Sequence, residues 1–599
     1  MQKRWNISQA DLTASAALQS HLHIHPVLCG ILAQRGITTP DQAAGYFHPR
    51  LEDLHSPWLM KDMDKAVSRI LQALEKKEKV LIYGDYDVDG TTAVACMVRF
   101  LKKVHPPELI SYYIPHRYKE GYGISMSGVY LAADNGFSLV ISMDCGISSA
   151  IYIDAAKVLG VDFIVCDHHL PNSILPPAVA ILNPKQEDCG YPYKDLCGCG
   201  VGFKLITALC QRLGLPDDEP YQYLDLVVTA IAADIVSVDG ENRILAWHGL
   251  KRINSSPNNG IKALIRSSGM TRPLKFTDLI FVLAPRINAV GRMDDACKIV
   301  ELFTTPHPEE AQTFAGILDT MNAERRTTDS NITEEAMDML KQAPADKKSI
   351  VLYRENWHKG VIGIVASRLT EKFARPTIVL TRNGGVVSGS GRSFTGFNMY
   401  EALHACRDHL VDYGGHPAAA GLTLQPDQVE AFTQKFEEIV SATIDIQSME
   451  PELNIDAEIS FSDIDTSFFG TLEAMEPFGP GNPQPVFITR NIIDKGYTKV
   501  VKELHIRFYI AQIGHARSFK GIGYHLAGKF SLLAGQQPID IVYTLEEDFW
   551  KAGSRKNITG FPEGSNVGPS DAEPVVRPVW NDRTYIQLKI TDFNPGIDH

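Results

Sequence analysis

The sequence predicts an α/β protein in which a mostly parallel sheet is followed by a second α/β lobe and then by a small β-barrel. From about residue 62, apolar strand-like runs alternate with segments of helical periodicity, which is typical of a parallel sheet covered by helices on both faces. After about residue 451, short β-like runs and many turn residues replace this alternation, and such a texture favours a barrel. The chain therefore changes architecture along its length.

The first predicted elements are helical. Residues 1–60 form an N-terminal helical segment that ends in a stretch punctuated by proline. In the α/β domain at 61–305, the run DMDKAVSRILQALEKK has apolar residues at helical spacing. Functional side chains of parallel sheets follow the carboxyl ends of the strands. Buried strands are expected at KVLIYG (79–84), FSLVISMD (137–144), DFIVCD (162–167) and AVAILNP (178–184).

Three further segments complete the predicted domain plan. The polar, helix-favouring stretch at 306–346 connects two lobes, and a second α/β domain at 347–450 begins with the strand-like KSIVLY. The barrel covers 451–599 and contains a flexible loop at 554–578, which is rich in Pro, Gly and Ser.

The composition excludes a wholly disordered chain and a membrane-spanning one. Of 599 residues, 44% are hydrophobic and 22% are charged, and no apolar run reaches about 18 residues. The N-terminal MQKRWNISQADL has no apolar run behind its basic residues, so we expect no secretory signal and a cytoplasmic protein. The net charge of −13 argues against a uniformly positive surface for nucleic acid but leaves room for a local basic groove.

The ten cysteines indicate a reducing compartment, because most of them lie singly in apolar stretches. Cys189, Cys197 and Cys199 form a cluster, but a zinc site needs a fourth ligand and usually a CxxC pair. We therefore expect buried thiols at these positions rather than a zinc site.

The strongest chemical signal is a series of acidic residues and histidines at the ends of four apolar runs, which we interpret as strands. Each Asp alone could be a helix N-cap or a turn residue. Together at one sheet edge, the carboxylates would repel one another unless divalent cations were bound. Such ligands suit Mn²⁺ and tolerate Mg²⁺, and two ions activate water and stabilise the leaving oxygen in phosphodiester cleavage. The residues are Asp85, Asp87 and Asp89 after LIYG, Asp144 after VISM, Asp167, His168 and His169 after FIVC, and Asp234 in LVVTAIAADIVSV.

Several motifs resemble a known superfamily. GDYDVDGTTA, MDCG, CDHH and AADIVSVDGENR resemble, in this order, the four motifs of the DHH phosphoesterases. APRINAVGRM, SGSGRS and GGHPAAAG resemble the RecJ family within it, the single-strand-specific 5′→3′ DNA exonucleases of bacteria. The resemblance covers roughly residues 60–490. It implies a DHH catalytic domain joined by a long helix to a DHHA1 domain.

The resemblance also implies a role for each matched residue. Asp144 would bridge two metal ions, Asp85 would support the site, and His169 would lie beside the scissile phosphate. The implied metal ligands are Asp87, Asp89, Asp144, His168 and Asp234, and the implied catalytic residues are Asp85, Asp144, His169 and Arg286.

One position departs from the small-molecule branch of the superfamily, whose HxxxDxD motif provides a histidine ligand. Asp87 and Asp89 match the two acidic positions of that motif, but Tyr83 stands where the histidine would be. This departure favours the exonuclease branch over the pyrophosphatases and cyclic-dinucleotide phosphodiesterases.

A polyanionic substrate needs positive groups near the metal ions. Arg286, Asn288 and Arg292 of APRINAVGR offer planar donors for phosphate oxygens, although any one arginine could instead form a surface ion pair. By resemblance, a 5′-terminal phosphate would be held by Arg117, Ser390 and Arg392, with His416 approaching it at the interface of the two lobes.

A local basic segment lies at 490–530, where eight basic residues stand against two acidic ones and aromatic residues are interleaved. Basic residues and stacking rings on a small barrel fit an OB-like fold that binds single strands. About half of the rings are expected to fill the barrel core instead. The residues predicted to bind the strand are Lys499, Lys502 and Lys520.

The sequence thus predicts a metal-dependent 5′→3′ exonuclease that is specific for single-stranded DNA, uses two Mn²⁺ or Mg²⁺ ions and releases 5′-mononucleotides. The resemblance implies a role in DNA recombination and repair. Two alternatives stay open: a DHH phosphodiesterase for oligonucleotides or cyclic dinucleotides, and a non-catalytic DNA-binding scaffold. We expect a monomer with no membrane contact, and a single-strand binding protein and a helicase as further partners.

Overall fold

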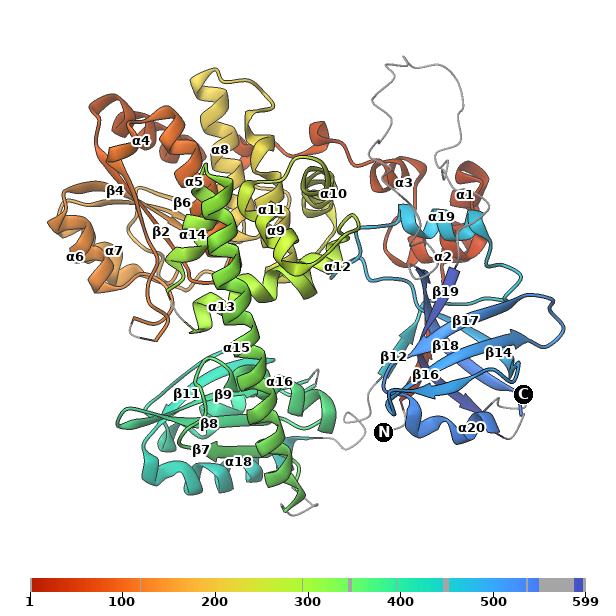
Figure 1. The fold of residues 1–599 in the computed structure, drawn as a ribbon. Coiled ribbons are helices and arrows are strands. Elements are labelled where there is room, and N and C mark those ends of the chain that lie inside the picture. The colour runs from red at the N-terminus through yellow and green to blue at the C-terminus, as the bar shows by residue number, and fades with distance from the viewer. Residues whose placement is uncertain are drawn as a thin grey trace, which may run out of the picture. The chain divides into compact units, whose positions relative to one another are not determined.

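The computed structural model describes residues 3–118, 120–293, 295–342, 347–394, 396–444, 452–534, 537–548 and 586–595. The chain forms two compact units, coloured by residue number in Figure 1. The first unit consists mainly of His55–Val236 and His248–Pro451. The second unit consists of Trp5–Leu54, Ser237–Trp247 and Glu452–His599.

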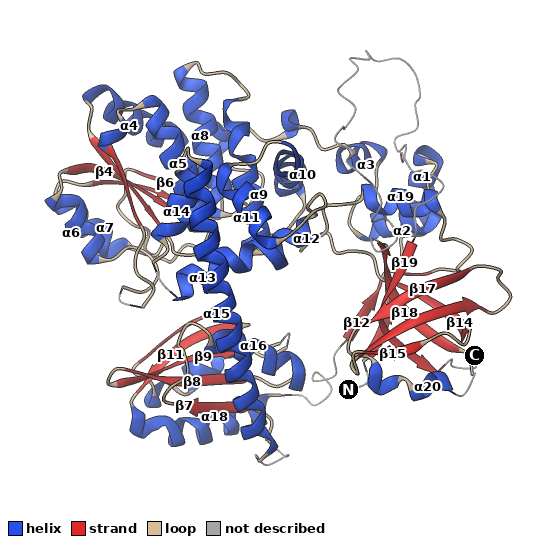
Figure 2. Cartoon of the chain, viewed as in Figure 1, coloured by secondary structure: helices blue, strands red, loops and turns tan. Residues whose placement is uncertain are grey.

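The first unit begins with a five-stranded parallel sheet, which Figure 2 shows among the helices that cover it. The four predicted strands are confirmed, and one strand that the sequence analysis did not identify lies at the edge beside β2. In sheet order the strands are β3 (Ile110–Tyr113), β2 (Lys79–Gly84), β4 (Phe137–Met143), β5 (Asp162–Cys166) and β6 (Ala180–Leu182).

Helices cover both faces of this sheet, as the alternation predicts. Leu81 and Tyr83 of β2 are buried in a core that includes residues of α6 and α7, and the alternate side chains of the strand point to the other face. On that second face, α5 packs against α8 and α9. The helices are α4 (Met63–Lys76), α5 (Val88–Val104), α6 (Met126–Asp134), α7 (Ala150–Val158), α8 (Gly198–Leu213) and α9 (Leu224–Asp234).

A helical region leads from the first sheet to the second. It ends in α15, a helix of 34 residues that runs from Pro308 to Lys341 and confirms the long helix expected there. The other helices are α10 (Gly240–Ser255), α11 (Asn259–Ser268), α12 (Phe276–Asp278), a π-helical turn (Leu279–Leu283), α13 (Ala284–Met293) and α14 (Cys297–Thr304).

The second sheet of the first unit is mixed. Only the β7–β8 pair is parallel among its four pairings. One face packs on α16 and the end of α15, and the other packs on α17 and α18. The elements are β7 (Ile350–Arg354), α16 (Ile362–Phe373), β8 (Thr377–Asn383), β9 (Val386–Arg392), α17 (Met399–Ala405), β10 (Asp412–Gly415), β11 (Ala419–Leu424) and α18 (Val429–Thr443).

The second unit contains the predicted barrel. Five strands close on themselves in the order β14, β18, β19, β17 and β16, because β14 also pairs with β16. The elements are β12 (Glu452–Ile455), β13 (Ala457–Glu458), α19 (Thr466–Ala474), β14 (Phe487–Asp494), β15 (Lys499–Val501), β16 (His505–Gln512), β17 (Ser518–Gly523), α20 (Ser531–Ala534), β18 (Ile539–Glu547) and β19 (Ile586–Pro595).

The N-terminal helices belong to the barrel unit. Leu18, Ile31 and Phe47 share one hydrophobic core with barrel residues such as Phe487 and Tyr543. A short strand, β1 (Arg4–Ile7), pairs with β12. The helices are α1 (Leu12–Leu22), α2 (Pro26–Gln34) and α3 (Pro40–Phe47).

Two further expectations from the sequence concern a flexible loop and a membrane-spanning segment. The loop predicted at 554–578 lies outside the described residues. Among the described residues, no helix combines the length and the apolar character needed to cross a membrane.

Candidate metal centre

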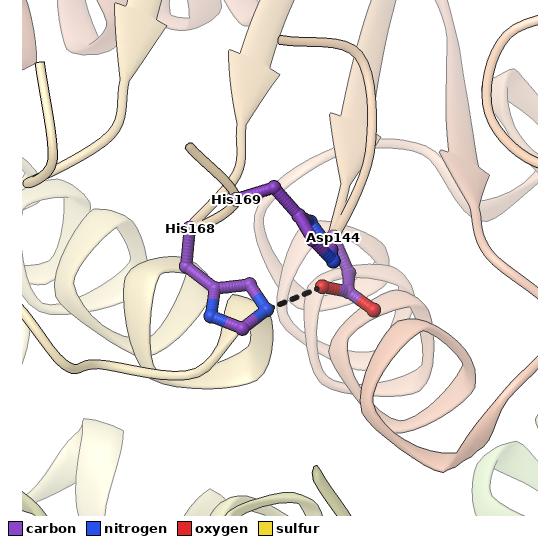
Figure 3. A group of neighbouring side chains, drawn as sticks. All are labelled: Asp144, His168 and His169. Atoms are coloured by element: carbon purple, nitrogen blue, oxygen red, sulfur yellow. Dashed lines mark ion pairs between the residues drawn. The ribbon is translucent and has the colours of Figure 1, made fainter. Parts of the chain in front are cut away.

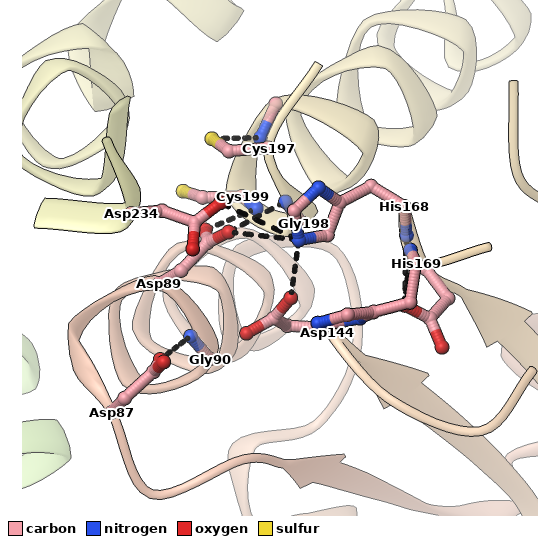
Figure 4. Close-up of polar contacts among 12 residues, drawn as sticks. Asp87, Asp89, Gly90, Asp144, His168, His169, Cys197, Gly198, Cys199 and Asp234 are labelled. Atoms are coloured by element: carbon pink, nitrogen blue, oxygen red, sulfur yellow. Dashed lines mark hydrogen bonds and ion pairs between the residues drawn. The ribbon is translucent and has the colours of Figure 1, made fainter. Parts of the chain in front are cut away.

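Side chains that follow β2, β4 and β5 converge at the carboxyl edge of the first sheet, as expected for a parallel sheet. Figure 4 shows five of these side chains together with Asp234; the five are Asp87, Asp89, Asp144, His168 and His169. Three overlapping groups have ligand atoms within 4.8 Å of one another. The groups are Asp144 with His168 and His169, Asp89 with His168 and Asp234, and Asp85 with Asp87 and Asp144.

His168 lies at the centre of the cluster. Its Nε2 is 3.2 Å from Oδ1 of Asp144, 3.5 Å from Oδ2 of Asp234 and 3.8 Å from Oδ2 of Asp89. Figure 3 shows the imidazole edge facing the Asp144 carboxylate. Burial and the charge of His169 lower the pKa of His168 to about 3. The ring is therefore neutral, which is the form that binds metal ions.

Burial makes the carboxylates of this cluster hard to ionise. Burial, and then repulsion from Asp87, raise the pKa of Asp89 to about 7. Burial and the charges of Asp89 and Asp87 raise the pKa of Asp234 to about 9. The pKa of Asp144 is raised for the same reasons, burial first and neighbouring carboxylates second. A divalent cation would remove this conflict.

Buried polar atoms that have no hydrogen-bond partner indicate whether these residues fit a divalent cation. Oδ1 of Asp85, Oδ1 of Asp144 and both ring nitrogens of His168 are buried without a hydrogen-bond partner. Buried polar atoms normally have a partner, so four orphaned atoms in one cluster need an explanation. Oxygen and imidazole donors are the ligands that Mn²⁺ accepts, and the donor set therefore fits a divalent ion.

Two of the acidic residues are also held by helix N-termini. Asp87 caps α5, because the Gly90 N–H donates to its Oδ1 at 3.0 Å. Asp89 accepts two N–H bonds from the first turn of α8, from Gly198 to Oδ2 and from Cys199 to Oδ1, both at 2.7 Å. Asp87 and Asp89 therefore bind helix N-termini, as an isolated Asp often does, and they also belong to the acidic cluster.

The prediction that Asp234 follows a strand is wrong. The run LVVTAIAAD forms α9, and Asp234 is its last residue. The run is buried on all sides, so its apolar character shows no helical periodicity and is compatible with a buried strand. Asp234 still reaches the cluster, because the end of α9 lies beside His168.

Asp167 and His169 form a pair beside the cluster. Oδ1 of Asp167 lies 2.8 Å from Nδ1 of His169, and the N–H groups of Ile147 and His168 also donate to this carboxylate. Burial raises the pKa of Asp167, but these bonds and the charge of His169 lower it more, below its usual range. Tyr122 completes the group, since its hydroxyl lies 3.0 Å from Nδ1 of His169 and donates to the Asp144 carbonyl.

Arginines gather where the two sheets of the first unit meet. Arg117 lies over the Tyr86 ring, and Nη1 of Arg392 donates to Oγ of Ser390 at 2.9 Å. Burial and the charges of Arg117, Arg392 and Arg325 lower the pKa of Arg292 to about 10. Burial and Arg117 likewise lower the pKa of Arg392. Repulsion among these half-buried guanidinium groups marks a place that favours an anion.

The other predicted substrate residues have varied surroundings. Arg286 pairs with Asp319 at 2.9 Å and donates to the Val282 carbonyl, so it has the ion pair that a single arginine often forms. Asn288 is half-buried on α13, and His416 is exposed at the turn between β10 and β11.

Tyr83 lies away from the metal ligands, in the core beneath α6 and α7. Its hydroxyl donates to the Gly123 carbonyl at 3.1 Å. It therefore anchors the loop that carries Arg117 and Tyr122.

A groove of about 910 Å³ lies on the barrel. Lys499 and Lys520, two of the lysines predicted to bind the strand, line this groove. Lys502, the third, is exposed on the hairpin of β15 and β16 and is not among the lining residues. The side chains that line the groove include Tyr497, Lys499, Arg507, Tyr509, Lys520 and Tyr524.

The three clustered cysteines are buried free thiols, as expected. Sequence reasoning missed the role of the residues around them. The Gly198 and Cys199 N–H groups bind a candidate metal ligand, and Tyr122 contacts His169. The signal in the sequence for the first is the run CGCG at the start of a helix.

Family models match three stretches of the chain. The DHH family, N-terminal domain, matches residues 79–231, the DHHA1 domain matches 346–442 and the RecJ OB domain matches 455–559. These matches agree with the parallel sheet, the mixed sheet and the barrel in that order. The exact domain boundaries expected from the sequence stay predictions.

Relatives named single-stranded-DNA-specific exonuclease RecJ match most of the chain. The Bacillus subtilis protein is 38% identical over 85% of this chain, which spans 64% of that relative's length. The Salmonella typhimurium protein is 32% identical over 91% of this chain and 96% of its own.

A solved structure has the same fold. The crystal structure of RecJ in complex with Mn²⁺ from Thermus thermophilus matches with a TM-score of 0.80 and 26% identity, over 99% of this chain and 80% of that one. The order of motifs, the three matched domains and the extent of the sequence identity agree. This chain belongs to the RecJ family of the DHH superfamily.

Proposed function

We propose that this chain is a single-stranded-DNA-specific exonuclease that digests from the 5′ end by two-metal-ion hydrolysis and releases 5′-mononucleotides, in DNA recombination and repair. The observation that carries the proposal is the cluster of buried, unsatisfied Asp and His atoms in the same unit as a group of half-buried arginines. The first suits divalent cations and the second suits a phosphate.

The metal ions would be held by Asp87, Asp89, Asp144, His168 and Asp234, with Asp85 beside them. Divalent ions held there would lower the pKa of a bound water and would stabilise the negative charge on the phosphate. The proposal of two ions is based on the three ligand groups, which overlap because Asp144 and His168 each belong to two of them.

His169 is the residue proposed to exchange a proton with the substrate. Its Nδ1 is held by Asp167 at 2.8 Å, and its side chain is 40% exposed. Burial lowers the pKa of His169, but the Asp167 carboxylate raises it more, above its usual value. A protonated, partly exposed imidazole can donate to a leaving oxygen, and Asp167 fixes its orientation.

The direction of digestion would be set by Arg117, Ser390 and Arg392. A terminal phosphate carries more negative charge than an internal phosphodiester, and a cluster of half-buried guanidinium groups favours the more charged group. Holding that phosphate would place the first phosphodiester near the metal cluster. Arg292 would add a further positive charge to this cluster.

The barrel groove would hold the strand farther from its end. Tyr497, Tyr509 and Tyr524 offer rings for stacking, and Lys499 and Lys520 offer charges for the backbone. Such surfaces bind any base sequence, because every base has a stacking face. A monomeric state, a single-strand binding protein and a helicase as partners stay predictions.

A polarity assay tests the function. Long single strands labelled at the 5′ or 3′ end, a blunt duplex and a dinucleotide are incubated with the full chain and Mn²⁺ or Mg²⁺. We expect early release of labelled mononucleotide only from the 5′-labelled single strand, and no release by Asp144→Ala. Faster turnover of the dinucleotide would favour the oligonucleotide phosphodiesterase, and no hydrolysis with either cation would favour the DNA-binding scaffold.

A further inference from the structure

We propose that the first turn of α8 is a template for the metal ligands, and that Gly198 is a positioning residue which fixes Asp89 and Asp144 at their mutual geometry. The inference rests on the proposed metal-dependent function. It concerns residues that hold the ligands rather than the ligands themselves.

The first observation is the way α8 holds Asp89. Both carboxylate oxygens of Asp89 accept an N–H from this turn, at 2.7 Å each, and Asp89 is 1% exposed. Figure 4 shows the Asp89 carboxylate joined by dashed lines to the Gly198 and Cys199 amides and to the His168 ring. Two bonds from one rigid turn fix the position and the rotation of the carboxylate together. They also direct the positive end of a 16-residue helix toward the acidic cluster.

The second observation is the contact between Gly198 and Asp144. A Cβ at position 198 would lie 2.5 Å from both Cβ and Oδ1 of Asp144 and 2.8 Å from its Cγ. Carbon and oxygen atoms do not approach that closely, so any side chain here would displace Asp144. Asp144 has little freedom to move, because it is 2% exposed and its backbone adopts φ +61°.

These two contacts come from one residue. The Gly198 amide binds Asp89, and its missing side chain makes room for Asp144. The peptide therefore sets the separation of two carboxylates that repel each other when no cation is present. Ligands fixed in advance lose less entropy on metal binding, and residues that orient ligands typically contribute about 10–100-fold to metal affinity.

The same helix provides two matched controls. A Cβ at Gly200 would meet only Leu196 and Cys197 atoms at 3.4 Å or more, which is ordinary contact. A Cβ at Gly202 would lie 2.4 Å from Cε of Met143, the flexible end of a core side chain. Alanine is better than glycine in a helix, so each substitution by itself favours α8. The three variants thus separate ligand displacement from crowding of the core.

The experiment measures Mn²⁺ binding to the full chain by calorimetry or by the electron paramagnetic resonance of free Mn²⁺, and thermal unfolding in EDTA. We expect Gly198→Ala to weaken Mn²⁺ binding by about tenfold or more. Gly202→Ala should lower the unfolding temperature but keep Mn²⁺ affinity. Gly200→Ala should keep Mn²⁺ affinity and should leave the unfolding temperature the same or slightly higher. Higher Mn²⁺ should restore hydrolysis by Gly198→Ala.

Several outcomes would overturn the inference. Wild-type affinity in Gly198→Ala would do so, as would an equal loss of affinity in Gly202→Ala. If Gly198→Ala does not fold, the double variant Gly198→Ala/Asp144→Gly is compared with Asp144→Gly alone. Equal stability of the two supports the contact, and continued unfolding of the double variant contradicts it. Absence of Mn²⁺ binding by the unaltered chain would instead refute the proposed metal site, which keeps the two failures distinct.

Discussion

At the scale of single residues, two backbone conformations border the metal centre. Asp144 has φ +61° and Ile235, the residue after Asp234, has φ +59°. The left-handed region is unfavourable for residues with a Cβ and most unfavourable for a β-branched one. Such strain is often found at functional sites, where surrounding structure maintains it. Here it ends α9 at Asp234 and directs that carboxylate toward His168.

Ile235→Asn should stabilise the first unit. Asparagine tolerates the left-handed region, and Ile235 is 62% exposed, so few contacts are lost. We expect a gain of about 1 kcal/mol in unfolding free energy. The gain is measured as a higher midpoint of thermal unfolding. The transition of the first unit is identified as the one whose midpoint Mn²⁺ also raises. Ile235→Val is the matched control, because it keeps the β-branch, and an equal midpoint in both variants would contradict the account.

Arg392→Ala should reduce the preference for a 5′-phosphate. The charge-assisted bonds it would make to a phosphate are worth roughly 1.5–3 kcal/mol, so we expect about a tenfold or greater loss of discrimination. The measurement compares kcat/KM on strands with phosphorylated and hydroxyl 5′ ends. Mn²⁺ affinity should not change. Arg382→Ala is the control, since Arg382 forms an exposed ion pair with Glu355 in the same sheet. An unchanged preference would place the 5′ end elsewhere.

At the scale of elements, the aromatic residues of the basic segment divide between the barrel core and the groove. Phe508 is 1% exposed in the core, and Phe519 packs against that core. Tyr497 and Tyr524 are exposed at 74% and 53% and line the groove with Tyr509. The expectation that about half of the rings fill the core is therefore confirmed.

Neutralising the groove should weaken the salt dependence of strand binding. The triple variant Lys499→Ala/Arg507→Ala/Lys520→Ala removes three charges that line it. Each phosphate contact on a single strand contributes roughly 0.7 to the slope of log K against log salt, so we expect a decrease of about 2. Fluorescence anisotropy of a labelled single strand measures the slope. Lys502→Ala is the control on the same hairpin, and a slope unaltered by the triple variant would exclude this groove as the DNA path.

At the scale of the whole molecule, the metal-free first unit contains carboxylates that bind protons more tightly when folded. The pKa values of Asp89 and Asp234 are raised from 3.8 to about 7 and about 9. Between 3.8 and these values the folded state holds more protons than the unfolded chain. Stability therefore falls as pH rises through this window, because deprotonation leaves buried, mutually repelling charges.

This linkage predicts opposite behaviour with and without metal. In EDTA, we expect the unfolding temperature of the first unit to fall by a few degrees between about pH 6 and about pH 9. With saturating Mn²⁺ the decrease should disappear, because the cation replaces the protons, and Mn²⁺ affinity should rise over the same range. Asp234→Asn should reduce the decrease in EDTA. A flat profile in EDTA for the unaltered chain would show that these carboxylates are ionised in the folded state.

The sequence by itself determined the parallel sheet, the order of the domains and the acidic edge. Strand periodicity and the residues after each strand are local properties, and a parallel sheet brings its carboxyl ends together whatever else the chain does. This is why Asp85, Asp87, Asp89, Asp144 and His168 were predicted to meet.

Only the tertiary structure decided which partners those residues have. The fully buried run before Asp234 gives no periodic signal, so its helix became apparent only from its packing. Arg286 pairs with Asp319, which lies 33 residues away along the chain, and Asp89 is held by amides more than a hundred residues away. Contacts between distant segments depend on which surfaces come together during folding. Local sequence patterns therefore predict the secondary structure of a segment but not the segments that it contacts.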